Sequence, residues 1–139
     1  MTLEKKLKQK FELTDIYKLS EYVLNECILT TARMPKNFKY NFGSRINESA
    51  LTLACGIAKV YMTKDINLKI KELQKLNDYS TELLILLRIA NNNNLFVNRK
   101  SYTSCSDNIV SIMSQSKRWE NSLKEKVQNE INSSDSNKV

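Results

Sequence analysis

Apolar residues recur at spacings of three and four along four stretches of this chain, which is the pattern of one face of an α-helix. The first stretch follows Thr14 and Asp15, whose side-chain oxygens can accept hydrogen bonds from the free N–H groups of a helix start. It should end near Arg33, because Pro35 disfavours helical conformation in the residue before it. The predicted apolar face consists of Ile16, Leu19, Val23, Cys27 and Thr30 or Thr31.

A second helix is predicted from Asn41 to Thr63, after a short basic link over residues 35–41. It carries two apolar stripes, which is typical of a helix that is covered on more than one side. We therefore expect it to be central in the fold or to face another subunit. The first stripe is Phe42, Ile46, Ala50, Leu53, Ile57 and Val60, and the second is Leu51, Cys55, Ala58 and Met62.

Asp65 is placed to cap a third helix, which should run to about Ala90 and stop at the asparagines 91–94. Its block 83–87 is apolar all round. Because an exposed leucine forgoes about 1.5–3 kcal/mol of burial, this block predicts a subunit interface. The apolar positions of the third helix are Ile66, Ile70, Leu73, Leu76, Leu83, Leu84, Leu87 and Ala90.

A fourth helix is predicted from a cap at Asn98 to about Lys126. Its face consists of Tyr102, Cys105, Ile109, Ile112 or Met113, Ser116, Trp119 and Leu123. The polar residues 127–139 predict a disordered tail. Residues 1–12 form a basic N-terminal extension, in which Leu3, Leu7 and Phe11 are compatible with a short helix or a frayed end.

Four amphipathic helices with short links predict an all-α protein, an antiparallel up-down-up-down four-helix bundle over residues 13–126. The 139 residues suit one domain, and two glycines and one proline are too few for the turns of a β-sheet protein. The excess apolar surface of the second and third helices predicts a homo-oligomer. We expect its interface to contain Leu51, Cys55, Met62, Leu84, Ile85, Leu86 and Trp119.

The sequence argues against catalysis. It contains no histidine, the commonest general base and metal ligand, so the usual di-iron site of helical bundles is excluded. It also lacks the glycine-rich motifs of phosphate-binding loops. The three cysteines form no Cys-x-x-Cys motif, and we expect them to be buried free thiols in a reducing cytoplasm. The prediction is a protein that is not an enzyme and has no catalytic residue, cofactor or metal.

A cytoplasmic location is expected from the segments that the sequence lacks. The first residues have no apolar core of the kind found in signal peptides. The longest apolar stretch, residues 83–87, is far shorter than the about 20 residues that span a membrane. We therefore expect no membrane association.

The charge balance favours a polyanionic partner. Lysine and arginine number 22 against 15 acidic residues, a net charge of +7. A genome rich in A and T would give a similar excess of lysine, so charge alone leaves both explanations open. The predicted nucleic-acid contacts lie in a first cluster, Arg33, Lys36, Lys39 and Arg45, and in a second cluster, Lys117, Arg118, Lys124 and Lys126.

The two clusters should lie at opposite ends of an up-down bundle. We expect them to contact phosphates rather than bases, so that binding depends strongly on salt and weakly on sequence. The alternative is that they are ordinary solubilising charges. Trp119 lies beside the second cluster, and we expect it to pack in the core or an interface rather than to stack on a base.

Several motifs resemble the Avd family, the accessory variability determinants of diversity-generating retroelements. Met34-Pro35-Lys36, followed by Phe38-Lys39-Tyr40-Asn41-Phe42-Gly43-Ser44-Arg45-Ile46, resembles the end of the family's first helix and the start of its second. The segment 86–90 resembles the end of its third helix. Tyr102 and Trp119 fall where the family carries aromatic residues in its fourth helix. The likeness spans roughly residues 14–124.

The resemblance implies a ring-shaped homopentamer that performs no chemistry. It implies binding of RNA or DNA through a positive surface and association with the retroelement reverse transcriptase, in support of mutagenic retrohoming. The family's functional positions carry over to Lys36, Arg45, Arg88 and Trp119, with Arg88 as a further nucleic-acid contact. Pro35 and Gly43 carry over as structural positions.

The chain departs from this family in one respect, since Lys117-Arg118 stands where the family often has glycines. A related family, encoded in intervening sequences of ribosomal RNA genes, shares the fold. It usually has a Ser-x-Pro-Ser-Asn-Ile-Ala-Glu-Gly-like stretch in the second helix, which this chain lacks. The alternative function is thus a structural or ribosomal-RNA-associated bundle of that type.

Overall fold

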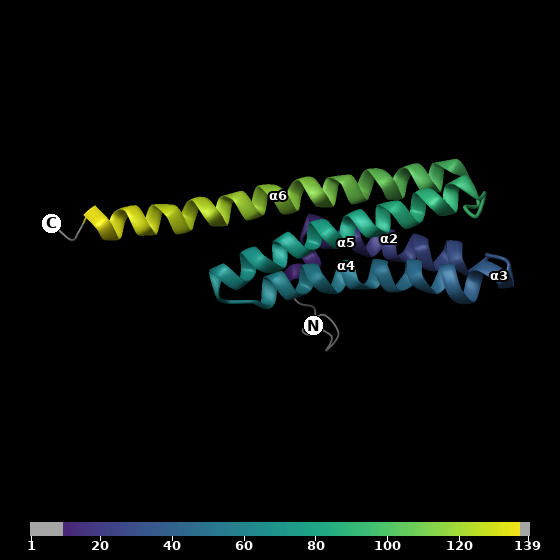
Figure 1. The fold of residues 1–139 in the computed structure, drawn as a ribbon, viewed down its shortest axis with the longest axis horizontal. Coiled ribbons are helices and arrows are strands. Elements are labelled where there is room, and N and C mark those ends of the chain that lie inside the picture. Colours follow the sequence, from purple (N-terminus) through teal and green to yellow (C-terminus); the bar gives the residue numbers. More distant parts are fainter. Residues whose placement is uncertain (1–9, 137–139) are drawn as a thin grey trace, which may run out of the picture.

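Four long helices form the protein in a computed structural model that describes residues 10–136 (Figure 1). Helices α2 and α5 each contact both α4 and α6, so the four surround a common core. Residues 10–136 contain no β-strand, which confirms an all-helical bundle. The long helices are α2 (Asp15–Ala32), α4 (Ser44–Met62), α5 (Ile66–Asn92) and α6 (Arg99–Ser136).

Three predicted helix boundaries are confirmed with their physical causes. The side chain of Asp65 accepts a hydrogen bond from the N–H of Leu68 at 3.0 Å, which caps α5. Asn98 Oδ1 accepts from the N–H of Ser101 at 2.8 Å and caps α6. Asn94 has a left-handed φ of 58° just after α5, as expected for an asparagine that ends a helix.

The start of α2 is confirmed, but the expected capping bond from Thr14 is absent. The Thr14 hydroxyl donates to the carbonyl oxygen of Phe11 at 2.6 Å, within the short 3-10 helix Lys10–Leu13. Its side chain makes no capping hydrogen bond with α2. The Thr14 hydroxyl therefore links the 3-10 helix to the start of α2 by donating a hydrogen bond, and it does not accept one from α2. Of the expected extension over residues 1–12, residues 1–9 lie outside the described part and residues 10–12 belong to this 3-10 helix.

The basic link predicted over residues 35–41 is helical, which corrects that expectation. The one-turn helix α3 (Lys36–Phe38) continues into the π-helical turn Lys39–Gly43, which runs directly into α4. Pro35 is the N-cap residue of this segment, just before the first helical turn, where its missing N–H removes no helical hydrogen bond. Its carbonyl accepts from the N–H groups of Phe38 and Lys39 at 2.9 and 2.8 Å.

The predicted end of α6 at Lys126 is also wrong, since the helix continues to Ser136. Residues 127–136 are thus helical rather than a disordered tail, and they extend past the end of the other helices (Figure 1). Leu123, Val127 and Ile131 continue the spacing of four, although the composition is polar. Residues 137–139 lie outside the described part.

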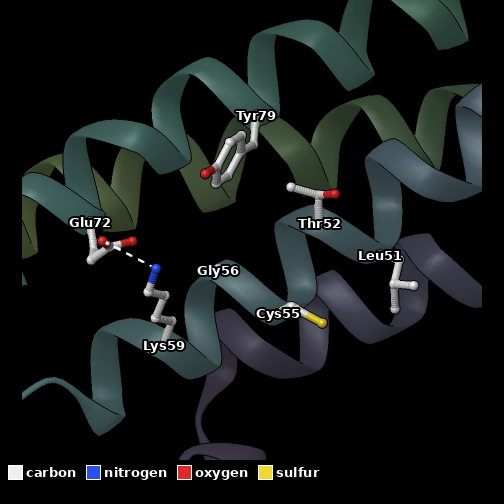
Figure 2. A pocket seen from close by; sticks show the side chains of 7 residues that line it. All are labelled: Leu51, Thr52, Cys55, Gly56, Lys59, Glu72 and Tyr79. Atoms are coloured by element: carbon white, nitrogen blue, oxygen red, sulfur yellow. Dashed lines mark ion pairs between the residues drawn. The ribbon is translucent and has the colours of Figure 1, made fainter.

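Helices α4 and α5 approach closely at Gly56, which is buried. A Cβ atom there would lie 2.9 Å from Leu76 Cδ2 and 3.3 Å from the Tyr79 ring. Figure 2 shows the groove beside this contact, with the thiol of Cys55 at one side and the ion pair of Lys59 and Glu72 at the other. The groove measures about 320 Å³ and is lined by Leu51, Thr52, Cys55, Gly56, Lys59, Glu72 and Tyr79.

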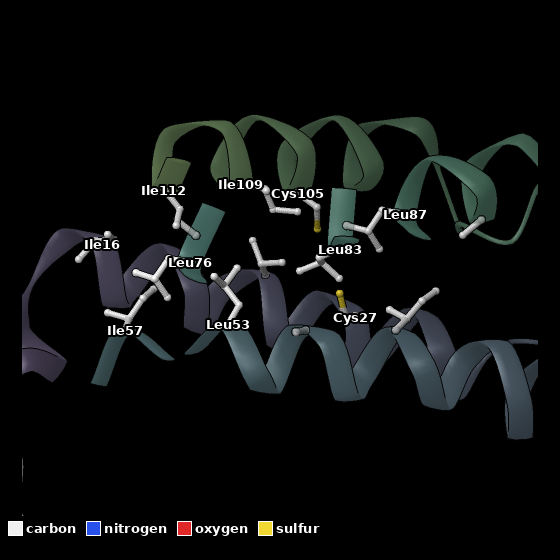
Figure 3. Packing of buried hydrophobic residues seen from close by; sticks show 14 of the residues in the cluster. Ile16, Cys27, Leu53, Ile57, Leu76, Leu83, Leu87, Cys105, Ile109 and Ile112 are labelled. Carbon is white, nitrogen blue, oxygen red and sulfur yellow. The ribbon is translucent and has the colours of Figure 1, made fainter. Parts of the chain in front are cut away.

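The core joins one apolar face from each long helix (Figure 3). Most predicted core-face positions are buried, while the half-buried ones are Leu19, Phe42, Ile66, Ile70, Leu84, Tyr102, Trp119 and Leu123. One predicted apolar face is therefore confirmed for each of the four helices. The second stripe predicted for α4 is not covered within the chain, since Leu51, Cys55 and Met62 are exposed and Ala58 is half-buried. The largest fully buried side chains are Val23, Cys27, Ile46, Leu53, Ile57, Val60, Leu73, Leu76, Leu83, Leu87, Ile109 and Ile112.

Candidate nucleic-acid interface

Two acid-free stretches of the chain meet at one end of the bundle. Residues 33–47 run from Arg33, the C-cap of α2, through α3 and the π turn to the start of α4. Residues 83–106 contain the end of α5 and the start of α6. The connections within both stretches lie at the same end (Figure 1). We call this end the basic pole. Its cations are Arg33, Lys36, Lys39, Arg45, Arg88, Arg99 and Lys100.

Arg99 and Lys100 were not among the sequence-predicted contacts. Both are exposed at the start of α6. The sequence feature that could have predicted them is the absence of acidic residues between Glu82 and Asp107. This absence is as clear in the sequence as the acid-free stretch around Lys36. The structure adds that the two stretches are spatial neighbours.

The predicted cations of the first cluster differ in solvent exposure and in whether they form ion pairs within the chain. Arg33 and Lys36 are exposed, as is Arg88, and none of the three forms an ion pair within residues 10–136. Lys39 is half-buried, and its Nζ lies 5.7 Å from the centre of the Tyr40 ring. Arg45 forms an ion pair with Glu82 of α5, so its charge is partly neutralised within the chain.

Two of the four cations in the second cluster are engaged within the described part of the protein. Lys117 and Lys124 form ion pairs with Glu120 at 3.6 and 2.7 Å. Glu120 is only 5% exposed, and Gln74 of α5 donates a further hydrogen bond to it at 3.2 Å. Only Arg118 and Lys126 of this cluster are exposed without an ion pair to a described residue. Phosphate contacts by this cluster stay a prediction, in which Lys117 and Lys124 would also have to serve Glu120.

The contacts of Glu120 stabilise its ionised form. The hydrogen bond from Lys124 is the largest effect that lowers the pKa of this carboxyl below its ordinary value. Gln74 and Lys117 lower the pKa further, whereas burial opposes them. A lowered pKa in the folded state means that this carboxylate favours folding above its ordinary pKa and that its contribution is lost in acid.

Changing Glu120 to glutamine should therefore reduce the dependence of stability on pH. We expect the wild type to lose more unfolding free energy than Glu120→Gln as the pH falls below the ordinary glutamate pKa of about 4.3. Urea unfolding at neutral and acidic pH measures this difference. Glu125→Gln, at an exposed position of the same helix, is the control and should follow the wild type. Equal pH dependence of all three proteins would contradict this assignment.

Trp119 packs within the bundle. It is half-buried, and its ring centre lies 4.6 Å from that of Tyr61. Tyr61 in turn stacks on Phe11 at 6.4 Å, so the three rings join the N-terminal 3-10 helix to α4 and α6. This packing accounts for an indole near the end of the bundle without a bound base.

The residues predicted for an oligomer interface are mostly exposed on the single chain. Leu51 is 52%, Met62 69% and Ile85 50% exposed, and Cys55 is exposed as well. Leu84 and Leu86 are half-buried and pack against the core. The block 83–87 thus divides into core positions Leu83 and Leu87 and outward positions around Ile85. Assembly through the outward positions stays a prediction.

The three thiols separate into two environments. Cys27 and Cys105 are buried as expected. Cys55 is exposed, because it belongs to the second apolar stripe of α4, with Leu51 and Met62. Burial raises the pKa of the Cys27 thiol strongly and that of the Cys105 thiol to about 12. The two buried thiols are therefore poor nucleophiles at neutral pH.

In dissociated chains, in which the expected subunit interface does not cover Cys55, a thiol-reactive disulfide reagent should label Cys55 quickly and the other two cysteines only after denaturation. We expect a fast phase of one thiol per chain out of three. Cys55→Ser should abolish that phase while leaving two thiols that react in denaturant. A fast phase that survives in Cys55→Ser would show that the core opens around Cys27 or Cys105.

Two further features bear on the chemistry of the described part. Within residues 10–136, no three side chains of the cysteine, aspartate and glutamate type are grouped closely enough to hold a metal ion. None of the described helices combines the length and apolar character needed to cross a membrane.

Comparison with models of known protein families finds none that matches this chain, and comparison with curated proteins also finds no match.

Proposed function

We propose that this chain is a non-enzymatic accessory protein that binds RNA or DNA at its basic pole and holds it beside a protein partner. The observation that carries the proposal is the convergence of two acid-free stretches, 33–47 and 83–106, at one end of the bundle. Arg33, Lys36 and Arg88 are exposed there without competing ion pairs to described residues. Such a surface suits a phosphate backbone.

The resemblance to the Avd family supplies the partner in this proposal. It points to the reverse transcriptase of a diversity-generating retroelement, with the chain supporting mutagenic retrohoming in the cytoplasm. Lys36 and Arg88 are both exposed at the basic pole, which supports this choice. Arg45 supports it less, because Glu82 already engages it.

The proposal includes an antiparallel up-down-up-down order of the helices and a ring of copies. The α4–α5 connection lies at the opposite end from the α5–α6 connection in Figure 1, which supports that order. Exposed Leu51, Met62 and Ile85 support assembly through the second apolar stripe of α4 and the outward positions of α5 around Ile85. The pentamer follows from the resemblance. A ring would place several basic poles together and raise avidity for a polyanion.

Replacing two outward apolar residues should break this assembly. We expect Leu51→Glu combined with Ile85→Glu to convert the oligomer into folded monomers, because both substitutions place charge in a desolvated contact. Light scattering at micromolar concentration measures the mass. Val110→Glu, which is 53% exposed on α6, is the control and should leave the oligomer intact. A wild-type chain that is already monomeric would contradict the ring.

The partner assignment has its own test. Affinity purification of the tagged chain from its native cells should recover a reverse transcriptase together with RNA. A gene for that enzyme and a template repeat should lie near the gene for this chain. Recovery of ribosomal RNA without a reverse transcriptase, from a gene inside a ribosomal RNA operon, would favour the intervening-sequence type instead.

A further inference from the structure

A groove opens at the basic pole between the α3–π segment and the end of α5. Its volume is about 390 Å³, enough for one nucleobase. It is distinct from the α4–α5 groove of Figure 2, since it shares no lining residue with that groove. The lining residues are Asn37, Phe38, Asn41, Phe42, Ile89, Asn93 and Leu95.

The walls of this groove combine aromatic rings with an aliphatic side chain that is open to solvent. Phe38, Phe42 and Leu95 are half-buried and pack against the core, so their positions are fixed. Ile89 is 43% exposed. Among residues 10–136, no charged residue lines the groove. A flat, uncharged ring is therefore a suitable occupant, because bases stack on aromatic side chains without regard to sequence.

The rim of the groove offers both a donor and an acceptor. Asn41 Oδ1 accepts from the N–H of Phe42, which leaves the Asn41 amide N–H groups free. Asn93 Nδ2 donates to the carbonyl oxygen of Ile89 at 2.8 Å, which leaves Asn93 Oδ1 free to accept. Asn37 makes no hydrogen bond through its side chain within the described residues and can do either. Together these asparagine side chains offer an amide donor and an amide acceptor, which match the hydrogen-bonding edges of bases.

Each wall of the groove has a cationic residue directly before one of its lining residues in the sequence. Lys36 precedes Asn37, and Arg88 precedes Ile89. Both are exposed and form no ion pair with a described residue. The combination of a neutral aromatic slot and flanking positive charge is complementary to a nucleotide, whose base is neutral and whose phosphates are negative. An apolar side chain of a protein partner would use the rings but not the amides or the charges.

We propose that this groove holds an unpaired nucleobase of a single-stranded segment, while Lys36 and Arg88 contact the adjacent phosphates. The proposal rests on the proposed nucleic-acid function and deepens it, since phosphate contacts alone do not distinguish single strands from duplexes. It implies that the basic pole prefers nucleic acid with unpaired bases, such as a loop or a strand end.

The test compares two strands of equal length and charge. The probes are a fluorescent oligothymidylate and a strand of the same length in which bases are replaced by abasic sites. Fluorescence anisotropy at one low salt concentration should show that the purified full chain binds the abasic strand about tenfold more weakly. A duplex probe, measured in parallel, reports phosphate binding by itself.

Matched variants locate the effect. Phe38→Leu with Asn41→Ala should bind both strands with the weaker affinity, while its duplex binding stays unchanged. The control, Tyr40→Leu with Asn92→Ala, removes an exposed ring from the same π turn and an amide outside the groove. It should keep the difference between the strands. Ile89→Ala, at an exposed position, repeats the test should the first variant fail to fold.

Each outcome decides between the two proposals. Equal, salt-dependent binding of both strands by the wild type would overturn the nucleobase site and leave the phosphate-binding function standing. A preference for bases that survives in every groove variant would also overturn it, because the base would then be held elsewhere. Loss of reverse-transcriptase association in Ile89→Ala, with unchanged strand preference, would assign the groove to a protein. Failure to bind any probe would overturn the proposed function itself.

Discussion

Simultaneous change of Arg33, Lys36 and Arg88 to glutamate should weaken duplex binding by about 100-fold or more in dilute buffer. Each substitution removes one expected phosphate contact and adds a charge that repels the backbone. All three side chains are exposed at the basic pole, and none is engaged in an ion pair with a described residue. The loss should therefore fall on binding and leave the thermal unfolding of the protein nearly unchanged.

A control variant separates local contacts from overall charge. Lys18, Lys64 and Lys71 are exposed away from the basic pole. Changing these three to glutamate alters the net charge by the same amount, so that general attraction to a polyanion falls equally in both variants. We expect the control to lose only a small part of the affinity. Equal losses in the two variants would show that binding follows net charge and that the basic pole is not a site.

Leu83→Ala should lower the free energy of unfolding by about 2–5 kcal/mol, the usual effect of removing a large side chain from a packed core. Leu83 of α5 is fully buried and lies among the core residues of Figure 3, between Cys105 of α6 and Cys27 of α2. Because three helices meet at this position, little room exists for neighbours to fill the space that is left. The loss is large against a typical stability of about 5–15 kcal/mol.

Leu68→Ala is the matched control for this substitution. It makes the same chemical change on the same helix, but Leu68 is 52% exposed, so the change should cost less than about 1 kcal/mol. Urea unfolding of all three proteins at one concentration measures both values, with concentration fixed because assembly would add to stability. Similar losses at the two positions would mean that α5 does not present Leu83 to the core.

The helices could be predicted from the sequence because their signals are local. Asp65 and Asn98 act within three residues of themselves, and the buried faces follow a spacing of three and four. The π turn Lys39–Gly43 could not be predicted this way. It packs closely on Met34, since a Cβ atom at Gly43 would lie 3.3 Å from Met34 Sδ, and such contacts are not visible in a local pattern.

For the basic clusters, ion pairs between residues close in sequence could be predicted, whereas those between distant residues could not. The partners of Glu120 lie three and four residues from it, and Glu120 itself is spaced by four from buried Ser116. Its engagement with Lys117 and Lys124 was therefore open to prediction. The pair of Arg45 with Glu82 joins residues 37 apart and needed the packing of α4 on α5. The meeting of the two acid-free stretches likewise needed the fold.

The most direct test of the central claim is the binding of the purified chain to a random-sequence RNA or DNA duplex over a series of salt concentrations. Phosphate contacts at the basic pole should give a logarithm of affinity that falls linearly and steeply with the logarithm of salt concentration. Removal of Lys36 alone should reduce that slope by about one. Absence of binding even in dilute buffer, or an affinity that does not change with salt, would contradict the account.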